Sequence, residues 1–258
     1  MIAPAPAKIN LALVVGPLRD DGKHELATVY QRVDLGDRIS VEPAQQTTVD
    51  GFDDTIVAGA LSLLPGAWHV RIEKHTPVAA GLGGGSSDAA TALKLAAAQL
   101  EEPVDLHAIA ARVGADVPFF LYDGPQLGTG DGTTLEALDL PQDFAVVLLL
   151  PHGATKPSTA DVYARFDQAG GFGERVATLR EALANVRRPR DLAALPANDL
   201  ASSPHAQALL DAGAFRADVS GAGPAIYGLF HHVADAQRAS RALSALGRTW
   251  ATVPAWYG

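Results

Sequence analysis

The most informative segment of this chain is Pro77-Val-Ala-Ala-Gly81-Leu-Gly83-Gly84-Gly85-Ser86-Ser87-Asp88-Ala-Ala90. Its four glycines let the backbone come close to a ligand and adopt positive φ angles. From Ser86 onward the pattern turns helical, so the unpaired N–H groups and the positive dipole end of a helix directly follow the loop. The stretch therefore predicts an anion site, and phosphate is the anion that suits it best. Ser86 and Ser87 either cap the helix or contact the phosphate or a magnesium ion.

This glycine loop differs from two common nucleotide-binding motifs. It lacks Gly-Lys-Ser/Thr, which excludes a Walker A loop. It also lacks the Gly-x-Gly-x-x-Gly spacing, which argues against a dinucleotide-dependent oxidoreductase. A tight turn before a helix is the plain structural alternative, but such a turn needs one or two glycines rather than four.

The composition is that of a packed globular protein. The chain has 258 residues, of which 48% are hydrophobic and none is cysteine, so disulfides, thiolate nucleophiles and cysteine-ligated metals are excluded. A formal charge of -9 gives no general attraction to nucleic acid or anionic membranes, and an anionic ligand must be held locally. The apolar run 144–150 is too short to span a membrane, and residues 1–10 lack a secretory signal pattern. We therefore expect a cytoplasmic protein without nucleic-acid or membrane partners.

Strand and helix patterns are mixed along the chain and predict an α/β (α+β) fold. The weakest boundary follows Pro151, where residues 151–157 are either a linker or an active-site loop. Residues 124–134 are expected to form a loop or hairpin. The predicted helices are one starting at residue 86 and those over 106–113, 159–168, 175–186, 204–212 and 233–246, and the predicted strands are 9–15, 32–41, 70–74, 119–122, 144–150, 218–220, 225–230 and 249–253.

Lys8 and Asp116 are candidates for the chemistry. Lys8 lies where an apolar strand is expected to start, and it is either solvated, as most lysines are, or part of a site. Asp116 lies between small and apolar residues, where it either caps a turn or, if partly desolvated beside a lysine, orients and deprotonates an alcohol. His24 lies in a charged turn without metal-ligand spacing, so a solvated loop competes with a ligand contact. The segment Ser220-Gly-Ala-Gly223 is a second glycine loop, which is either a plain turn between strands or a loop that lines the same ligand as the first.

Five motifs resemble those of the GHMP kinases in their order and rough spacing. The first, third and last motifs carry the resemblance to the superfamily. The second and fourth point to members that phosphorylate a methylerythritol unit linked to cytidine diphosphate. The motifs are Pro6-Ala-Lys8-Ile-Asn10-Leu11, Asp21-Gly-x-His24-Glu-Leu26, the glycine loop, Gly114-Ala-Asp116-Val-Pro-Phe-Phe120 and Ser220-Gly-Ala-Gly223.

The resemblance implies a two-domain GHMP kinase fold. Residues 1–150 would form a ribosomal-protein-S5-like N-terminal domain that carries the ATP phosphate loop, and residues 151–258 would form a ferredoxin-like C-terminal domain. ATP and the substrate would meet in the cleft between them. The implied reaction transfers the γ-phosphoryl group of ATP to the 2-hydroxyl of the methylerythritol unit, in the non-mevalonate route to isoprenoid precursors.

The resemblance also implies the roles of individual residues. Asp116 would accept the proton of the alcohol with Lys8 beside it, while His24 would read the cytosine and Tyr163 would stack on it. Mg²⁺ would neutralise the phosphates, mostly through waters, and no metal ligand is assigned. The residues implied for ATP are Pro77, Gly81, Gly83, Gly84, Gly85, Ser86 and Ser87, and those implied for the substrate are Asn10, His24, Thr159, Tyr163, Gly221 and Gly223.

One position departs from the family pattern. The residue before His24 is usually a tyrosine that stacks on the base, and here it is Lys23. Such a stack contributes roughly 1–3 kcal/mol, so cytidine binding is expected to weaken unless the lysine stem or another aromatic side chain compensates. Two rival functions stay open: a GHMP kinase for a smaller alcohol, of the homoserine or mevalonate type, and a non-catalytic nucleotide-binding module. The presence of both Lys8 and Asp116 argues against the second. The chain is expected to be a monomer or a homodimer.

Overall fold

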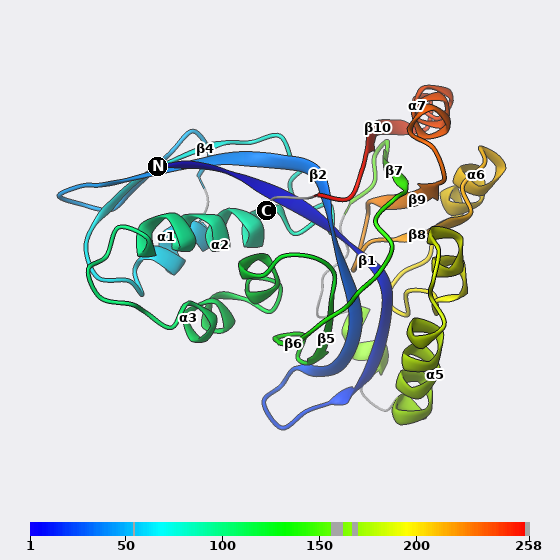
Figure 1. Cartoon of the computed structure of the whole chain (residues 1–258), viewed down its shortest axis with the longest axis horizontal. Coiled ribbons are helices and arrows are strands. Elements are labelled where there is room, and N and C mark those ends of the chain that lie inside the picture. The colour runs from blue at the N-terminus through cyan, green and yellow to red at the C-terminus, as the bar shows by residue number, and fades with distance from the viewer. Residues whose placement is uncertain (54, 156–161, 167–169, 256–258) are drawn as a thin grey trace.

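Two long strands organise the molecule. The structure is a computed structural model that describes residues 1–53, 55–155, 162–166 and 170–255. Strands β1 (Ile2–Leu18) and β2 (His24–Pro43) pair antiparallel and cross most of the molecule (Figure 1). They have 17 and 20 residues, against an average strand of about 5–6. Because they are so long, both halves of the chain pack on the same pair of strands.

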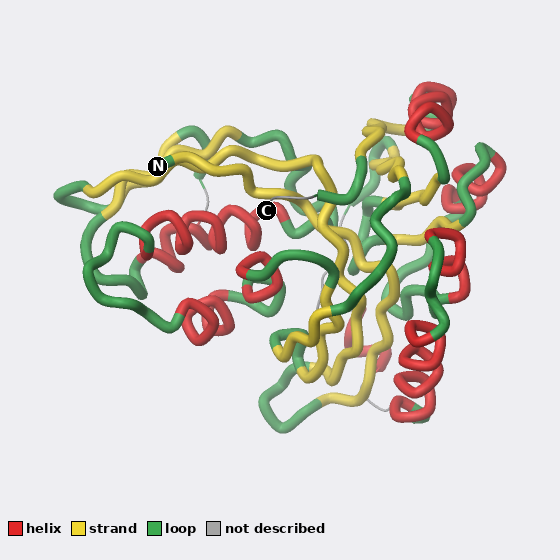
Figure 2. Tube along the Cα trace, viewed as in Figure 1, coloured by secondary structure: helices red, strands yellow, loops and turns green. Residues whose placement is uncertain are grey.

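The first sheet belongs to the N-terminal half. Among the described residues its strand order is β3-β4-β2-β5-β6, with β1 also paired to β2. Only the β3–β4 pairing is parallel in this part of the chain. Helices α1, α2 and α3 gather on one side of the sheet (Figures 1 and 2). The elements are β3 (Thr48–Asp50), α1 (Thr55–Leu61), β4 (Trp68–Glu73), α2 (Gly84–Ala97), α3 (Leu106–Val113), β5 (Gln126–Gly130) and β6 (Thr134–Ala137).

The second sheet has the order β10-β7-β9-β8 in the described residues and is antiparallel. Strand β7 is buried on both faces: Val146 and Leu148 face the core shared with β1 and β2, while Val147 and Leu149 pack under α6 and α7. Helix α5 lies alongside β1 (Figure 1). The elements are β7 (Ala145–Pro151), α5 (Phe172–Ala184), α6 (His205–Asp211), β8 (Arg216–Val219), β9 (Ile226–Phe230), α7 (Val233–Ala242) and β10 (Gly247–Thr252), with short 3-10 helices η1 (Pro118–Leu121), η2 (Ala164–Phe166) and η3 (Pro189–Ala194).

Two expectations about secondary structure need correction. The segment 119–122 is not a strand: Pro118 opens the 3-10 helix η1, in which the N–H of Phe120 bonds to the carbonyl of Val117 at 3.1 Å. A run of four apolar residues fits either structure, and proline favours the first turn of a helix. Lys8 lies inside β1 rather than at its start. The sequence patterns did not predict helix α1, and half of the predicted helix 159–168 lies outside the described residues.

The chain leaves the first sheet after β6 and enters the second sheet at β7. Because β7 pairs with β9 and β10, residues 145–150 are part of the second sheet, although the prediction places them in the N-terminal domain. Sheet pairing alone does not define a domain boundary, so the division of the chain at residue 150 stays a prediction. Within the described ranges, no helix combines the length and the apolar character that a bilayer span requires.

Candidate active site

A cavity of about 480 Å³ lies where the glycine loop, β1 and the turn at 221–222 meet. It contains two lysines, four acidic or phenolic groups that can exchange hydrogen bonds with them or with a ligand, and an apolar side to which Phe52 and Ile56 contribute. Its lining residues are Lys8, Asn10, Leu13, Leu26, Tyr30, Phe52, Asp53, Thr55, Ile56, Lys74, the loop residues 77–86, Asp116, Tyr163, Leu200, Gly221 and Ala222.

Lys8 and Asp116 meet in this cavity. The β1–β2 register shifts between Pro6 and Ala7 and again after Asn10, so Lys8 lies between two irregularities that redirect side chains. Its Nζ is 3.3 Å from Asp116 Oδ2, and the two side chains are 4% and 33% exposed. The lysine is therefore buried and ion-paired rather than solvated, and the carboxylate keeps one side open to the cavity.

Neighbouring polar groups hold both members of this pair. Lys8 Nζ donates to Asn10 Oδ1 at 2.7 Å, and Asn10 Nδ2 donates to Thr28 Oγ1 at 2.8 Å. The Tyr30 hydroxyl donates to Asp116 Oδ1 at 3.0 Å. Burial, followed by the charge of Asp116, raises the pKa of Tyr30, which keeps its hydroxyl a donor. The ammonium and the carboxylate are thus each fixed by a second contact.

The glycine loop packs tightly against two other parts of the cavity wall, strand β1 and the second glycine loop. Gly81 and Gly83 have φ angles of 82° and 69°, which glycine adopts without strain. A Cβ at Gly83 would lie 2.9 Å from Lys8 Cγ, and one at Gly81 would lie 2.3 Å from the carbonyl oxygen of Ser220. The backbone N–H of Lys8 also bonds to the carbonyl of Leu82 at 2.9 Å. The loop, β1 and the second glycine loop therefore form one rigid wall.

Gly84 and Gly85 instead open helix α2, with Gly83 as the residue before its first turn. A Cβ at Gly84 would lie 3.1 Å from Lys74 Nζ and 3.0 Å from Thr76 Cγ2. The glycine at this position is thus required by close packing and not by a positive φ angle.

A buried cluster of Lys74, Asp37 and Asp88 supports the start of α2, and no sequence motif pointed to it. Lys74 Nζ lies 2.8 Å from Asp37 Oδ2 and 2.6 Å from Asp88 Oδ2, and both carboxylates are fully buried. Burial would raise the pKa of Asp37, but hydrogen bonds from Lys74 and from the N–H groups of Thr76 and His75 lower it. Burial raises the pKa of Asp88 to about 8. Lys74 lies three residues before the glycine loop, so its position in the sequence could have marked it as a site candidate. Asp37 has no comparable local signal.

The proposed cytidine side of the site contains His24 and Tyr163. Their ring centroids are 5.3 Å apart with an interplanar angle of 39°, and Tyr163 is the member that lines the cavity. Lys23 pairs with Asp131 at 2.5 Å. Burial would raise the pKa of Asp131, but hydrogen bonds from Lys23 and Thr133 lower it to about 2. The ammonium of Lys23 is therefore directed to the turn between β5 and β6.

Most of the predicted site residues converge on the cavity. Three predicted residues are buried outside the lining: Ser87, whose hydroxyl oxygen has no hydrogen-bond partner in the described structure, His24, which packs behind Tyr163, and Gly223. Thr159 lies outside the described residues. The predicted residues that line the cavity are Lys8, Asn10, Pro77, Gly81, Gly83, Gly84, Gly85, Ser86, Asp116, Tyr163 and Gly221.

The chain matches two family models, the GHMP kinases N terminal domain over residues 47–124 and the GHMP kinases C terminal over residues 206–249. It is 38% identical over 262 residues to the 4-diphosphocytidyl-2-C-methyl-D-erythritol kinase of Anaeromyxobacter sp. (strain K), with 89% of this chain and 80% of that relative covered. The chain belongs to this family of GHMP kinases. The resemblance inferred from the five motifs is confirmed.

Solved structures agree with this family and with the two-part α/β fold. The structure of a 4-(cytidine 5'-diphospho)-2C-methyl-D-erythritol kinase superposes with a TM-score of 0.79 at 35% identity, covering 99% of this chain and 100% of that one. A homoserine kinase from Cytophaga hutchinsonii superposes with a TM-score of 0.66 at 18% identity, covering 96% and 94%. The second match shows a shared fold alone. The predicted GHMP kinase fold is confirmed.

Proposed function

We propose that this chain is an ATP-dependent kinase that phosphorylates the 2-hydroxyl of 4-diphosphocytidyl-2-C-methyl-D-erythritol. The observation that carries the proposal is the Lys8–Asp116 pair, which faces the same cavity as a glycine loop at the start of a helix. A proton acceptor and a phosphate-binding loop are the two parts that phosphoryl transfer to an alcohol requires. Family membership supports the choice of substrate.

The chemistry follows from the positions of these groups. A tertiary alcohol is a weak nucleophile, so the Asp116 carboxylate would accept its proton as the oxygen attacks the γ-phosphorus and the bond to ADP breaks. The Lys8 ammonium would favour the ionised carboxylate and offset the negative charge on the transferred group. The Tyr30 hydroxyl occupies one oxygen of Asp116, which leaves Oδ2, beside Lys8, for the alcohol.

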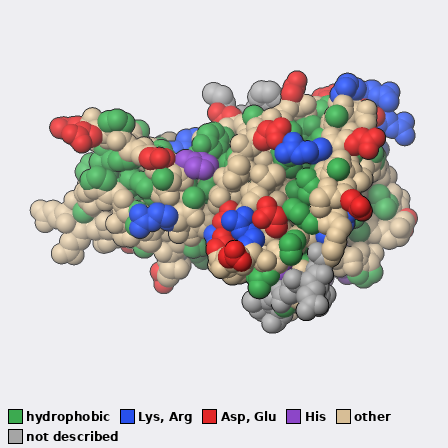
Figure 3. Space-filling model, turned by 90° about the horizontal axis from the view of Figure 1, so that it is seen from below, with side chains coloured by type: hydrophobic (Ala, Val, Ile, Leu, Met, Phe, Trp, Pro, Cys, Tyr) green, Lys and Arg blue, Asp and Glu red, His purple; other side chains and the backbone are tan. Residues whose placement is uncertain are grey.

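ATP would be held mainly by the backbone of the glycine loop. The N–H groups at the start of α2 and the helix dipole attract phosphate oxygens, and Lys74 brings a second ammonium to this wall. Near the centre of the face drawn in Figure 3, acidic and basic side chains lie next to one another. These local phosphate-binding groups explain how a chain with a net charge of -9 would bind both ATP and a diphosphate-containing substrate.

Magnesium fits this site as an ion carried by ATP. The described part of the chain has no cluster of three or more acidic or histidine side chains that could hold a metal. The cavity offers the carboxylates of Asp53 and Asp116 as oxygen donors. Magnesium commonly binds through one or two carboxylates, waters and substrate phosphates, and it would supply charge neutralisation of the phosphoryl group.

The cytidine end would lie against Tyr163, with His24 behind it. This assignment rests on family membership and on the ring of Tyr163 in the cavity wall. A cytoplasmic location and a monomeric or homodimeric state stay predictions from the sequence.

ADP release tests the proposal. The purified protein is given ATP, Mg²⁺ and either the cytidine-linked substrate, homoserine or mevalonate, and ADP is measured with a coupled assay. We expect turnover with the cytidine-linked substrate only, and competition by CDP. Turnover with a simple alcohol and indifference to CDP would establish the smaller-alcohol kinase, and ATP binding without turnover on any substrate would establish the binding module.

A further inference from the structure

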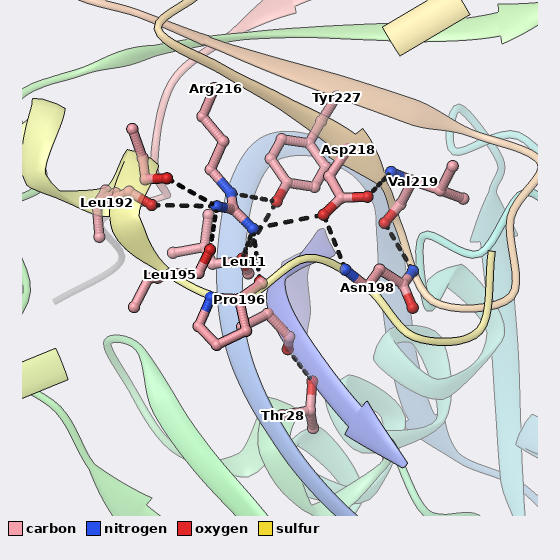
Figure 4. Close-up of polar contacts among 12 residues, drawn as sticks. Leu11, Thr28, Leu192, Leu195, Pro196, Asn198, Arg216, Asp218, Val219 and Tyr227 are labelled. Atoms are coloured by element: carbon pink, nitrogen blue, oxygen red, sulfur yellow. Dashed lines mark hydrogen bonds and ion pairs between the residues drawn. The ribbon is translucent and has the colours of Figure 1, made fainter. Parts of the chain in front are cut away.

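A buried polar network joins the second sheet to β1 (Figure 4). At its centre is Arg216 of β8, which is 7% exposed. Its guanidinium donates to the carbonyls of Leu11 and Leu195, both at 2.7 Å, and to the Tyr227 hydroxyl at 3.1 Å. It also lies 3.4 Å from Asp218 Oδ2. Since Leu11 belongs to β1, this cation ties the strand that carries Lys8 to the C-terminal half.

Asp218 connects Arg216 to Asn198 in this hydrogen-bond network. Asp218 Oδ2 accepts the backbone N–H of Asn198 at 2.9 Å. The Asn198 side chain then donates to the carbonyls of Val219 and Gly221, at 2.9 and 2.6 Å, and its oxygen accepts the N–H of Leu200 at 2.9 Å. Asn198 is 8% exposed, so these bonds replace those that water would make. The side-chain amide of Asn198 thus binds the carbonyls on either side of Ser220, where the second glycine loop begins.

The turn held by Asn198 is part of the cavity wall beside the catalytic lysine. Gly221 has a φ angle of 57° and lines the cavity. A Cβ on Gly221 would lie 3.5 Å from Lys8 Nζ and 3.3 Å from Asn10 Oδ1. Any relaxation of this turn therefore changes the space around the lysine ammonium, and reaction rates are sensitive to displacements of about 1 Å.

We propose that Asn198 is a positioning residue for phosphoryl transfer, which holds the Gly221 turn against Lys8 and Asn10. The proposal rests on the proposed kinase function of the Lys8–Asp116 pair. Arg216 and Asp218 orient Asn198 from the opposite side. Loss of the amide leaves the carbonyls of Val219 and Gly221 buried without a donor, so the turn rearranges to find new partners.

The test compares Asn198→Ala with Gln31→Ala. Gln31 is a matched control because it is 1% exposed, donates its amide to the carbonyl of Arg32 at 2.9 Å and to Gln142 at 2.8 Å, and lies outside the cavity lining. We expect both variants to lose similar thermal stability. Asn198→Ala should lower kcat roughly 10- to 100-fold with the Kd for ATP within about threefold of wild type, and Gln31→Ala should leave kcat unchanged. A folded Asn198→Ala with normal kcat, or an equal kcat loss in both variants, would overturn the proposal.

A second measurement reports on Lys8 without any substrate. In protein labelled with ¹³C at lysine Cε, the Lys8 signal is assigned by its absence in Lys8→Arg. We expect this signal to shift in Asn198→Ala and to stay in place in Gln31→Ala; an unchanged signal would contradict a positioning role. If the wild type shows no turnover, the proposed function fails, and the lysine signal still decides whether Asn198 positions Lys8. If Asn198→Ala does not fold, Asn198→Ser, which keeps one short donor, takes its place in both measurements.

Discussion

The ammonium of Lys8 lies 3.3 Å from the carboxylate of Asp116, with one partner buried in β1 and the other half open to the cavity. The lysine comes from the middle of a strand and the aspartate from the turn between α3 and η1. Each is held by a further contact, Lys8 by Asn10 and Asp116 by Tyr30. A pair fixed in this way can accept a proton at one oxygen without reorganisation during the reaction.

The proton-acceptor role predicts the effect of Asp116→Asn. The variant keeps the size of the side chain but cannot accept the proton of the alcohol, so kcat should fall roughly 10²- to 10⁴-fold while both substrates still bind. Single-turnover kinetics and direct binding measurements separate these effects. Near-normal turnover would show that Asp116 caps a turn, since asparagine is an equally good cap residue.

The same pair predicts non-additive effects. Lys8→Ala removes the charge beside Asp116, and the two groups act on one transition state, so the double variant should lose much less activity than the product of the single losses. Kinetics of the two single variants and the double variant form the required cycle. Fully multiplicative losses would indicate that the groups act independently.

Close packing of the glycine loop predicts the effect of Gly83→Ala. Its Cβ would meet Lys8 Cγ at 2.9 Å and Phe120 Cζ at 3.0 Å in addition to the cost of a positive φ angle. We expect kcat to fall roughly 10- to 100-fold and ATP binding to weaken, because the loop and the lysine both move. Gly124→Ala is the control, since Gly124 has a φ angle of 72° with no atom within 4 Å of its Cβ position. It should cost roughly 1–2 kcal/mol of stability without a change in kinetics.

The position of Tyr163 in the cavity wall predicts selective loss of the cytidine-linked substrate. Removal of a base stack of roughly 1–3 kcal/mol in Tyr163→Ala should raise its Kd by one to two powers of ten and leave ATP binding nearly unchanged. Tyr163→Phe keeps the ring and should bind the substrate as the wild type does. Equal weakening of both ligands in Tyr163→Ala would identify a structural residue instead.

The raised pKa of Asp88 predicts a pH dependence of stability. Burial raises this pKa from 3.8 to about 8, so the native state holds the proton more tightly than the unfolded state between these values. The contribution of Asp88 to the free energy of unfolding should then fall as pH rises through this window, by up to about 1.4 kcal/mol per pH unit. Asp88→Asn stays neutral at every pH. Urea unfolding from pH 5 to 9 should show the stability of the variant increasing relative to wild type up to about pH 8 and levelling off above it, and a constant difference would refute the shift.

Several features of this protein follow from local sequence. The four glycines of the 77–90 stretch and the helical spacing of Ala90 and Leu93 act over a few residues, so the loop and helix α2 were predictable, as was the hairpin after residue 124. The sequence also identified Lys8 and Asp116 as candidates. The run 119–122 was misassigned because a short apolar segment satisfies two structures, and its packing on Tyr30 and Arg32 favours η1.

Other features depend on packing between segments that are far apart in the sequence. Asp37 lies in β2, Lys74 directly follows β4 and Asp88 lies in α2, and the cluster forms because the fold brings these three segments within hydrogen-bond distance. Asn198 similarly depends on the register that sets its segment against β1 and β8. Local sequence patterns were enough to predict which segments fold locally and which groups could do the chemistry. Which of those groups meet, and which charges stay buried and paired, depends on contacts between segments far apart in the chain, because burial and electrostatic interaction are properties of the packed structure.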